Sequence, residues 1–319
     1  MDISVVVPMY NEEANVEGLI TDVIASCDGL GRSYEVICVN DGSADATADR
    51  LDVAAARYPQ LKVIHFSGNY GQTPAMAAGL EASTGDVILM MDGDRQNDPA
   101  DFSRLLEKLD EGYDLVSGWR KDRKDSEIRK VPSRIANRLI GRITGVRLHD
   151  YGCSLKAYRR GFLDPADVFG EMHRFFPVYV AMNGGRVAEL VVKHHPRTAG
   201  VSKYGLNRIF RVLADLLLVH LLQRYATRPL HYFAKVAQWC VAFAGTMFVL
   251  AVILGIWAPG RPFLAIPILA GMIAGVGAML SVGLGLVAEY AVRARYTPGD
   301  KRPWLIKRTV NLDPSKPPG

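Results

Sequence analysis

Two long stretches in the last third of the chain contain no charged side chain. The first runs from Val236 to Pro259 and the second from Pro262 to Ala288, and Arg261 is the only charge between them. A helix needs about 20 predominantly apolar residues to cross a bilayer, so each stretch is long enough. A buried helix of a water-soluble domain is the alternative, but such a helix rarely lacks charge over this length. We therefore predict that residues 231–292 form a two-helix transmembrane hairpin.

Basic residues flank this hairpin at both ends and indicate its orientation. Three precede it and six follow it: Arg224, Arg228 and Lys235, then Arg293, Arg295, Lys301, Arg302, Lys307 and Arg308. Because cytoplasmic loops of membrane proteins are enriched in Lys and Arg, both ends are expected on the cytoplasmic side. Residues 293–319 would then be a basic cytoplasmic tail. Near Met1 there is no basic segment of the kind that begins a signal peptide. Residues 1–205 are therefore also expected at the cytoplasmic face of the inner membrane.

The segment before the hairpin has a different pattern. From Leu206 to Tyr225, apolar residues alternate with charged ones at helical spacing. This predicts an amphipathic juxtamembrane helix over 206–230, which lies in the interface or packs against the preceding domain. In the second apolar stretch, Gly271 and Gly275 have a spacing that allows close helix contact and would permit a homo-oligomer.

Composition excludes several classes of protein. The 319-residue chain is 49% hydrophobic, which is ample for a folded core. Its net charge is +5, but the basic residues form no tract with interleaved aromatic residues. We therefore expect no nucleic-acid partner, and we assign this charge to contacts with a membrane surface and with phosphate groups. Four cysteines lack metal-ligand spacing and are expected to be reduced thiols: Cys27, Cys38, Cys153 and Cys240.

Strand and helix patterns alternate through the first 100 residues. Strands are predicted at Ser4–Val7, Tyr34–Val39, Lys62–Phe66 and Val87–Met91, and helices at Ala14–Cys27, Asp45–Tyr58 and Thr73–Ser83. This alternation is typical of a doubly wound α/β domain with a mostly parallel sheet. Right-handed crossovers then bring the carboxyl ends of the strands to one edge of the sheet, where such folds bind ligands.

Carboxylates follow the fourth of these strands directly. Asp92 and Asp94 flank Gly93, and Gln96 adds a neutral oxygen two residues later. Two acids so close can share a hard cation such as Mg²⁺. An ordinary surface turn is an equally good reading of these residues when they are considered alone.

The loops after two other strands carry polar residues to the same edge. They are Pro8-Met9-Tyr10-Asn11-Glu12 and Asn40-Asp41-Gly42-Ser43. Acids in these loops suit ribose hydroxyls and base N–H groups, whereas Asp92 and Asp94 suit a metal bound to a diphosphate. The chain has neither the G-x-G-x-x-G pattern nor the G-x-x-x-x-G-K-[ST] pattern, so the usual dinucleotide and P-loop sites are excluded.

These motifs resemble those of inverting GT-A glycosyltransferases in the family of dolichyl-phosphate mannosyltransferase. The bacterial polyprenyl-phosphate branch, with its aminoarabinose and glucosyl transferases, is the most similar part of that family. The residues that carry the resemblance are Val5–Glu13, Val39–Ser43, N-Y-G-Q at Asn69–Gln72, D-G-D-R-Q at Asp92–Gln96, S-G-W-R at Ser117–Arg120, D-Y-G-C at Asp150–Cys153 and V-S-K-Y at Val201–Tyr204. The resemblance spans nearly the whole chain, including the hairpin. It implies a GT-A catalytic domain over residues 1–205.

The resemblance also implies roles for individual residues. Pro8, Tyr10, Glu12 and Asp41 would hold the nucleoside, and Asp92, Asp94 and Gln96 would surround a Mg²⁺ or Mn²⁺ ion and the diphosphate. Arg120, Arg129, Ser133, Arg197 and Lys203 would bind phosphates of donor and acceptor, with Asp94, Arg120 and Lys203 closest to catalysis. Family members often read D-A-D-L-Q, so Gly93 and Arg95 are departures, and Arg95 could bind phosphate or point to solvent.

Several of these residues have plainer readings. Arg120 could be a surface cation, and Arg129 and Ser133 could belong to a solvated face. Asp150–Cys153 either shapes the acceptor or sugar side or forms a structural turn. His194 and His195 are read as strand or surface residues, because no Cys or acid lies at metal-ligand spacing.

The expected reaction is transfer of a sugar, with inversion, from a nucleotide-diphospho-sugar to polyprenyl (undecaprenyl) phosphate at the membrane. Similarity of the N-Y-G-Q and D-Y-G-C motifs to enzymes that use UDP-sugars favours UDP over GDP. A phosphate oxygen is already anionic near neutral pH, so a strong general base is not required. Two alternatives are a processive polysaccharide synthase with the same fold and a silent membrane scaffold that binds a nucleotide sugar.

Overall fold

A computed structural model describes residues 1–121, 137–138, 140–162, 172–196, 229–257, 265–295 and 304–312. The chain divides into two compact units. The sheet unit comprises Met1–Leu216 and Arg302–Gly319, and the hairpin unit comprises Leu217–Lys301. The expected juxtamembrane helix at 206–230 lies almost entirely outside the described residues, so it stays a prediction, as do the other domain boundaries.

An eight-stranded sheet forms the centre of the sheet unit. Its strand order is β7-β5-β6-β4-β1-β2-β3-β8. The strands are β1 (Ile3–Met9), β2 (Tyr34–Asn40), β3 (Leu61–Phe66), β4 (Val87–Met90), β5 (Leu115–Trp119), β6 (Lys156–Arg159), β7 (Val187–Val191) and β8 (Ile306–Val310). The four neighbours β4, β1, β2 and β3 are parallel, whereas β6 and β8 run antiparallel to the strands beside them. The prediction of a mostly parallel α/β sheet is therefore confirmed.

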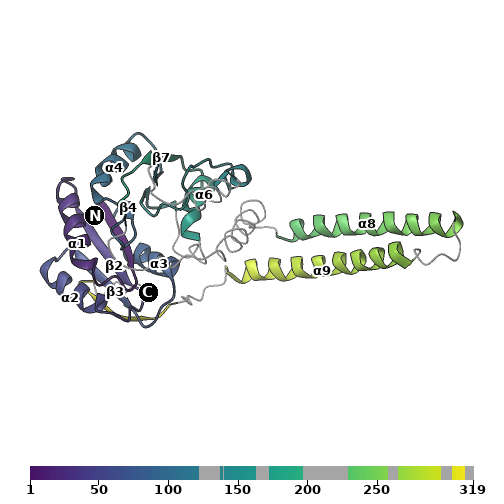
Figure 1. The fold of residues 1–319 in the computed structure, drawn as a ribbon, viewed down its shortest axis with the longest axis horizontal. Helices are drawn as coiled ribbons and strands as arrows, with labels where there is room; N and C mark the ends of the chain where they lie inside the picture. The colour runs from purple at the N-terminus through teal and green to yellow at the C-terminus, as the bar shows by residue number, and fades with distance from the viewer. Residues whose placement is uncertain are drawn as a thin grey trace. The chain divides into compact units, whose positions relative to one another are not determined.

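Helices cover both faces of this sheet (Figure 1). On one face lie α1 (Val16–Asp28), α2 (Thr47–Arg57) and α4 (Phe102–Asp110), and on the other lie α3 (Gln72–Ala82) and α6 (Phe176–Met182). Alternation along β1 explains the two layers, because successive side chains of a strand point to opposite faces. Val5 and Val7 pack in a core with α1, α2 and α4, whereas Val6 packs against Gly79 of α3. Two 3₁₀ turns, Pro99–Asp101 and Met172–Phe175, precede α4 and α6.

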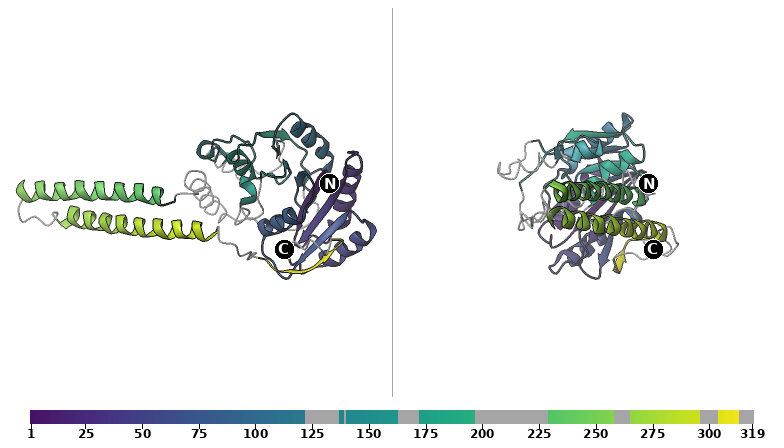
Figure 2. Two further views of the ribbon diagram at one scale, coloured as in Figure 1. Left: turned by 180° about the vertical axis from the view of Figure 1, so that it is seen from behind. Right: turned by 90° about the vertical axis from the view of Figure 1, so that its right-hand side faces the viewer.

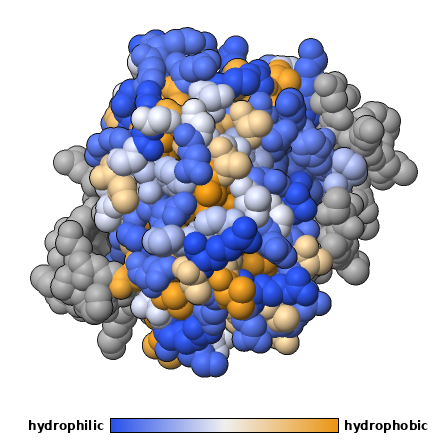
Figure 3. Space-filling view, turned by 90° about the vertical axis from the view of Figure 1, so that its left-hand side faces the viewer, coloured by the Kyte–Doolittle hydropathy of each residue, from blue (hydrophilic) through white to orange (hydrophobic). Residues whose placement is uncertain are grey.

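The hairpin unit consists of α8 (Pro229–Trp257) and α9 (Ala265–Arg295), which pack against each other. Residues 230–257 and 265–288 are long and apolar enough to cross a membrane. Large apolar side chains such as Trp239, Ile256 and Met279 are more than 70% exposed, as lipid-facing residues would be. By contrast, Figure 3 shows a mainly hydrophilic face of the sheet unit with only scattered hydrophobic residues.

Glycines allow α9 to approach α8 within the same chain. A Cβ on Gly285 would lie 2.8 Å from Cβ of Phe233, so glycine is required for this spacing, and Gly271 also faces α8. Gly275, the second residue of the expected glycine pair, meets nothing within 4 Å among the described residues. Gly271 thus contributes to contact inside the hairpin, and the homo-oligomer stays a prediction.

The chain returns to the sheet unit after the hairpin. Ile306–Val310, which we expected in a basic tail, form β8 and pair antiparallel with β3 at the edge of the sheet. Figure 2 shows β8 in yellow beside the purple and blue strands of the N-terminal region. This pairing could not be predicted, because Ile-Lys-Arg-Thr-Val is too short and too basic to be recognised as a strand.

Candidate active site

The loops after β1 and β2 are bonded to each other at the carboxyl edge of the sheet. β1 and β2 are in register from Ile3 opposite Tyr34 to Met9 opposite Asn40, so both strands end at the same level. Asn11 N donates to Ser43 Oγ at 2.9 Å, and Ala44 N donates to Asn11 Oδ1 at 2.8 Å. The structure therefore brings together two of the three loops that sequence placed at this edge.

Two glycines permit the close approach of the loops. Gly42 has φ of +63°, and a Cβ there would lie 2.3 Å from the backbone carbon of Gly68. A Cβ on Gly93 would lie 3.1 Å from both Pro8 O and Met9 Cγ. Gly93 thus lets the loop after β4 rest on the end of β1, which brings the third loop to the same edge.

Asp41 organises the N-Y-G-Q loop. Its two carboxylate oxygens accept hydrogen bonds from Tyr70 N at 2.7 Å and Gly71 N at 2.9 Å. Asp41 is 3% exposed, so the loop covers it. The next residue, Gln72, begins α3, and its Nε2 donates to Asp92 Oδ1 at 2.6 Å. The loop therefore connects Asp41 to the acidic pair after β4.

Asp92 and Asp94 form an acidic pair in a confined place. Loss of hydration by burial, together with the negative charge of Asp94, raises the pKa of Asp92 above its usual value. Two neighbouring carboxylates repel each other unless a proton or a cation lies between them. Among the described residues no group of three His, Cys, Asp or Glu side chains could hold a metal.

The two residues after Asp94 direct their side chains away from the acidic pair. Arg95, at φ of +57°, directs its guanidinium to α1, where Nη2 donates to Asp22 Oδ2 at 2.7 Å. In this structure the partly exposed guanidinium is therefore paired with Asp22 of α1. Gln96 donates its backbone N–H to Asp94 Oδ1 at 3.1 Å, and its side-chain Nε2 lies 3.5 Å from His195 O. The structure thus shows Gln96 supporting Asp94 through its backbone.

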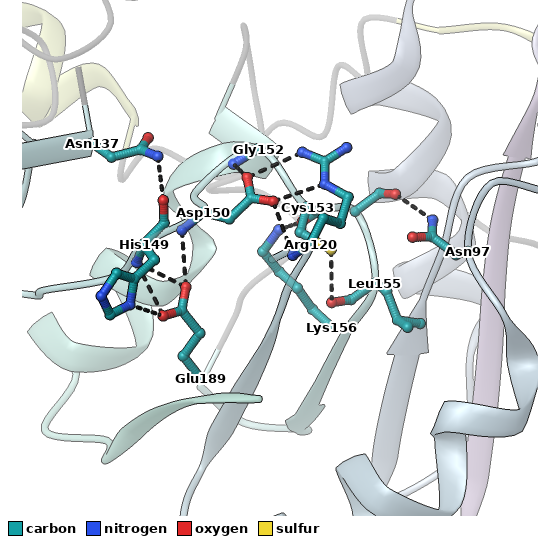
Figure 4. A network of polar contacts seen from close by, with 11 residues as sticks. Asn97, Arg120, Asn137, His149, Asp150, Gly152, Cys153, Leu155, Lys156 and Glu189 are labelled. Carbon is teal, nitrogen blue, oxygen red and sulfur yellow. Dashed lines mark hydrogen bonds and ion pairs between the residues drawn. The ribbon is translucent and has the colours of Figure 1, made fainter. Parts of the chain in front are cut away.

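Arg120 forms a shielded ion pair with Asp150 (Figure 4). Nε of Arg120 donates to Asp150 Oδ2 at 2.7 Å, and Nη2 donates to Oδ1 at 3.0 Å. Despite the cost of burial, the Asp150 hydrogen bond and charge raise the pKa of Arg120. The surface-cation reading of Arg120 is therefore wrong, because its side chain is only 13% exposed. Asp150 belongs to the D-Y-G-C motif, so this pair joins two of the motifs that sequence singled out.

Two residues that sequence did not single out complete this region. Glu189 of β7 accepts hydrogen bonds from His149 N and Asp150 N, each at 2.9 Å, and thereby fixes the start of the motif. Lys156 of β6 is 3% exposed, and its Nζ donates to Cys153 O. Burial lowers the pKa of Lys156, while the negative charges of Asp150 and Asp92 oppose that shift. Gln72 was inside a quoted motif, but neither Glu189 nor Lys156 showed any local signal.

The remaining predicted residues of the first loop lie at the same edge. Pro8 is buried near the end of β1, beyond the last pairing of β1 with β4 at Val6–Met90. Its lack of an N–H therefore costs no hydrogen bond on that side. Tyr10 and Glu12 are partly exposed, and Glu12 Oε2 accepts from Asn15 Nδ2 at 2.6 Å. These positions are compatible with a ligand at the loop.

Four predicted phosphate-binding residues lie outside the described residues. They are Arg129, Ser133, Arg197 and Lys203. His194 and His195 precede two of them, and His195 Nε2 lies 3.2 Å from Asp98 Oδ2 on the surface. This matches the reading of His195 as a surface residue.

Comparison with known proteins identifies the family. The sequence model for glycosyl transferase family 2 matches residues 4–165. Dodecaprenyl-phosphate galacturonate synthase of Rhizobium johnstonii is 41% identical over 99% of this chain and 95% of its own length. Undecaprenyl-phosphate 4-deoxy-4-formamido-L-arabinose transferase of Pseudomonas paraeruginosa is 36% identical over 99% of this chain and 92% of its own length.

Solved structures agree on the fold. A mannosyltransferase from Pyrobaculum calidifontis, in complex with GDP-Man and Mn²⁺, has a TM-score of 0.50 and 20% identity over 94% of this chain and 76% of its own. Mannosyl-3-phosphoglycerate synthase from Rubrobacter xylanophilus has a TM-score of 0.52 and 18% identity over 70% of this chain and 74% of its own. With the family match and the two relatives above 30% identity, the chain belongs to glycosyl transferase family 2 and is a glycosyltransferase with the GT-A fold.

Proposed function

We propose that this glycosyltransferase moves a sugar from a UDP-linked donor to a polyprenyl phosphate at the cytoplasmic face of the inner membrane, with inversion at the anomeric carbon. The observation that carries this proposal is the acidic pair Asp92–Asp94 beside the Asp41 loop, in a chain that also contains a membrane-length hairpin. Both relatives above are named for transfer to a polyprenyl phosphate.

The donor's nucleoside would lie against the loops after β1 and β2. Pro8, Tyr10 and Glu12 would line one side, and Asp41 would act both through its own carboxylate and through the loop that it holds. The diphosphate would then lie toward Asp92, Asp94 and Gln96.

A divalent cation fits the acidic pair. Burial and the negative charge of Asp94 raise the pKa of Asp92, and a cation would offset both effects. Asp92 and Asp94 would hold Mg²⁺ or Mn²⁺ together with the donor diphosphate. The bound ion would stabilise negative charge on the leaving diphosphate. Mn²⁺ is present in the solved Pyrobaculum mannosyltransferase, which supports the choice of metal.

The acceptor phosphate would attack the anomeric carbon directly. Arg120, held rigidly by Asp150, would present its remaining nitrogen Nη1 to a phosphate and reduce the repulsion between the two anionic substrates. Four further residues are proposed to contact phosphates of donor and acceptor at the membrane side: Lys203, Arg129, Ser133 and Arg197. No residue is required as a strong general base.

The return of the chain supports a hairpin that crosses the membrane twice. Residues before α8 and after α9 belong to the same sheet unit, through β7 and β8 respectively. Both ends of the hairpin must therefore be on one side of the bilayer. The basic residues flanking it favour the cytoplasmic side.

A transfer assay tests this function. Detergent-solubilised protein is given undecaprenyl phosphate, Mg²⁺, Mn²⁺ or chelator, and labelled UDP- and GDP-sugars that include galacturonate and 4-deoxy-4-formamido-L-arabinose. We expect metal-dependent product that partitions into organic solvent from one UDP-sugar. Asp94→Asn should abolish it, whereas the matched control Asp22→Asn, which alters an exposed carboxylate paired with Arg95, should not.

Two outcomes would contradict the proposal. Labelled product that stays in water and grows in length would indicate a processive synthase. A folded, membrane-inserted Asp94→Asn protein with the wild-type rate would remove the acidic pair from the mechanism.

A further inference from the structure

Strand β8 makes contacts that go beyond ordinary strand pairing. Its register places Arg308 opposite His65 of β3, and cross-strand partners point to the same face of a sheet. On that face Arg308 meets Asp52 of α2: Nη1 donates to Oδ1 at 2.9 Å, and Nη2 donates to Oδ2. A fork of this kind fixes both side chains in orientation.

The contact continues from Asp52 toward the active site. His65 Nε2 lies 3.1 Å from Asp52 Oδ1, and His65 Nδ1 lies 3.1 Å from Asn40 Nδ2. An amide nitrogen only donates, so Nδ1 accepts and the proton of the neutral ring lies on Nε2, which donates to Asp52. His65 and Asn40 are 2% and 3% exposed, so the hydrogen bond between them is shielded from water.

The side chain of Asn40 also holds the turn Asn40–Ser43. Its Oδ1 accepts from Ser43 N at 3.1 Å and closes the turn Asn40–Ser43. Ser43 Oγ in turn accepts from Asn11 N of the loop after β1. One continuous chain of hydrogen bonds therefore runs from Arg308 to both loops of the proposed nucleoside site.

A second route from β8 reaches the same turn through aromatic rings. Trp304, just before β8, stacks on Phe66 with ring centroids 6.1 Å apart, and Phe66 meets Tyr70 edge-on at 5.6 Å. Tyr70 N donates to Asp41 Oδ1 at 2.7 Å. Trp304 is 7% exposed, so this stack is well packed. The two routes use different side chains and end on adjacent residues, Asn40 and Asp41.

We propose that β8 is a supporting element of the donor site, with Arg308 and Trp304 as positioning residues that fix the turn Asn40–Ser43 for the nucleotide. The segment that follows the membrane hairpin thereby sets donor affinity, although no residue of β8 needs to touch the donor. This inference rests on the proposed function for the identity of the donor, and it assigns to Arg308 a role other than the membrane-flanking charge expected from sequence.

The test compares substitutions on β8 in the full chain. Arg308→Ala should raise the KM for the UDP-sugar and the Kd for UDP about tenfold, the scale on which loss of a supporting hydrogen-bond partner weakens a bound group. The KM for undecaprenyl phosphate should stay within about twofold, because surface charge alone contributes little. Arg308→Lys, which keeps the charge and one hydrogen bond, should recover part of the loss.

Matched controls separate positioning from stability. Lys307→Ala removes a neighbouring exposed charge from the same strand and should leave both constants unchanged. Arg32→Ala breaks an exposed ion pair with Asp110 and reports the effect of an unrelated lost pair. Trp304→Leu tests the aromatic route independently and should also raise the Kd for UDP.

The outcomes are distinguishable from those of the proposed function. Arg308→Ala and Trp304→Leu proteins that melt earlier but bind UDP as the wild type does would overturn the inference, as would equal rises in the KM of donor and acceptor. Wild-type protein that binds UDP but transfers no sugar would refute the proposed function alone, and the Kd comparison would still decide the role of β8. Wild-type protein that binds neither UDP nor GDP would refute both.

Discussion

Conversion of Asp150 to Asn is the substitution that most directly tests the arrangement around Arg120. It preserves the size of the side chain and one acceptor oxygen, but it removes the negative charge and presents an NH₂ group to one of the two guanidinium donors. Arg120 would keep one hydrogen bond, to the uncharged amide oxygen of Asn. It would lose the bidentate pair of hydrogen bonds that fixes the orientation of its guanidinium.

The expected loss follows from the shielding of this pair. Removing one partner of a buried ion pair costs about 3–5 kcal/mol. Arg120 and Asp150 side chains are 13% and 9% exposed, and Asn retains one hydrogen bond, so we expect about 2–3 kcal/mol. If that energy positions Arg120 for the transition state, kcat/KM falls roughly 30- to 160-fold.

Steady-state transfer kinetics on Arg120→Lys, Asp150→Asn and the double variant measure this loss and its coupling. Since both residues act through one guanidinium, the double variant should be no slower than the slower single variant. Asp110→Asn is the matched control, because it makes the same change in an exposed pair. Thermal unfolding of each protein corrects for loss of folded enzyme.

Two results would refute this reasoning. An Asp150→Asn enzyme within about threefold of the wild-type kcat/KM would mean that Asp150 does not set the position of Arg120 for catalysis. Losses that add fully in the double variant would mean that the two residues act separately, despite their contact.

Three further predictions concern stability and the acidic pair. Glu35 is fully buried and hydrogen-bonded to Ser4, Lys62 and Thr84, so Glu35→Ala should lower the free energy of unfolding by about 3–5 kcal/mol. Calorimetry should show a Tm lower by roughly 6 to 20 °C, with activity per folded molecule unchanged. An unchanged Tm would contradict this expectation. Burial lowers the pKa of His65, with a further contribution from the charge of Arg308. The fold therefore has its full stability from this residue above the unfolded-state pKa of about 6.5 and loses it as pH falls below that value. The wild-type Tm should drop more between about pH 7 and pH 5 than the Tm of His65→Asn, and parallel curves of Tm against pH would show that His65 does not contribute to this pH dependence. Gln72→Leu removes a hydrogen bond to Asp92. The metal concentration that gives half-maximal transfer should rise about tenfold. An unchanged metal titration would show that this hydrogen bond does not position Asp92.

The parallel half of the fold could be predicted because its signals are local. Each of β1 to β4 contains a short apolar run, and the predicted bounds differ from the observed ones by at most two residues at either end. Topology then forces the carboxyl ends of adjacent parallel strands together. For this reason the convergence of Asn11, Asp41 and Asp92 could be expected before any coordinates were known.

The partners of the site residues could not be predicted, because they depend on contacts between distant segments. Glu189 reaches Asp150 across 39 residues, and Gln72 reaches Asp92 across 20. Nothing in the sequence around Glu189 distinguishes it from an exposed strand residue. The direction of Arg95 was equally hidden, since it depends on a positive φ and on Asp22 of α1.

The edge strand β8 is another element whose place depends on contacts between distant segments of the chain. Without it, β3 would present a row of unpaired backbone groups at the edge of the sheet, and such an edge invites pairing with other chains. Asn311 strengthens this closure by donating from Nδ2 to Leu61 O, 250 residues earlier in the chain. The polypeptide thus has to pass through its apolar hairpin before its catalytic sheet is complete. A shortened protein that ends before the hairpin would keep every loop of the site and lose the strand that supports two of them, so the hairpin and the donor site are linked by covalent order as well as by function.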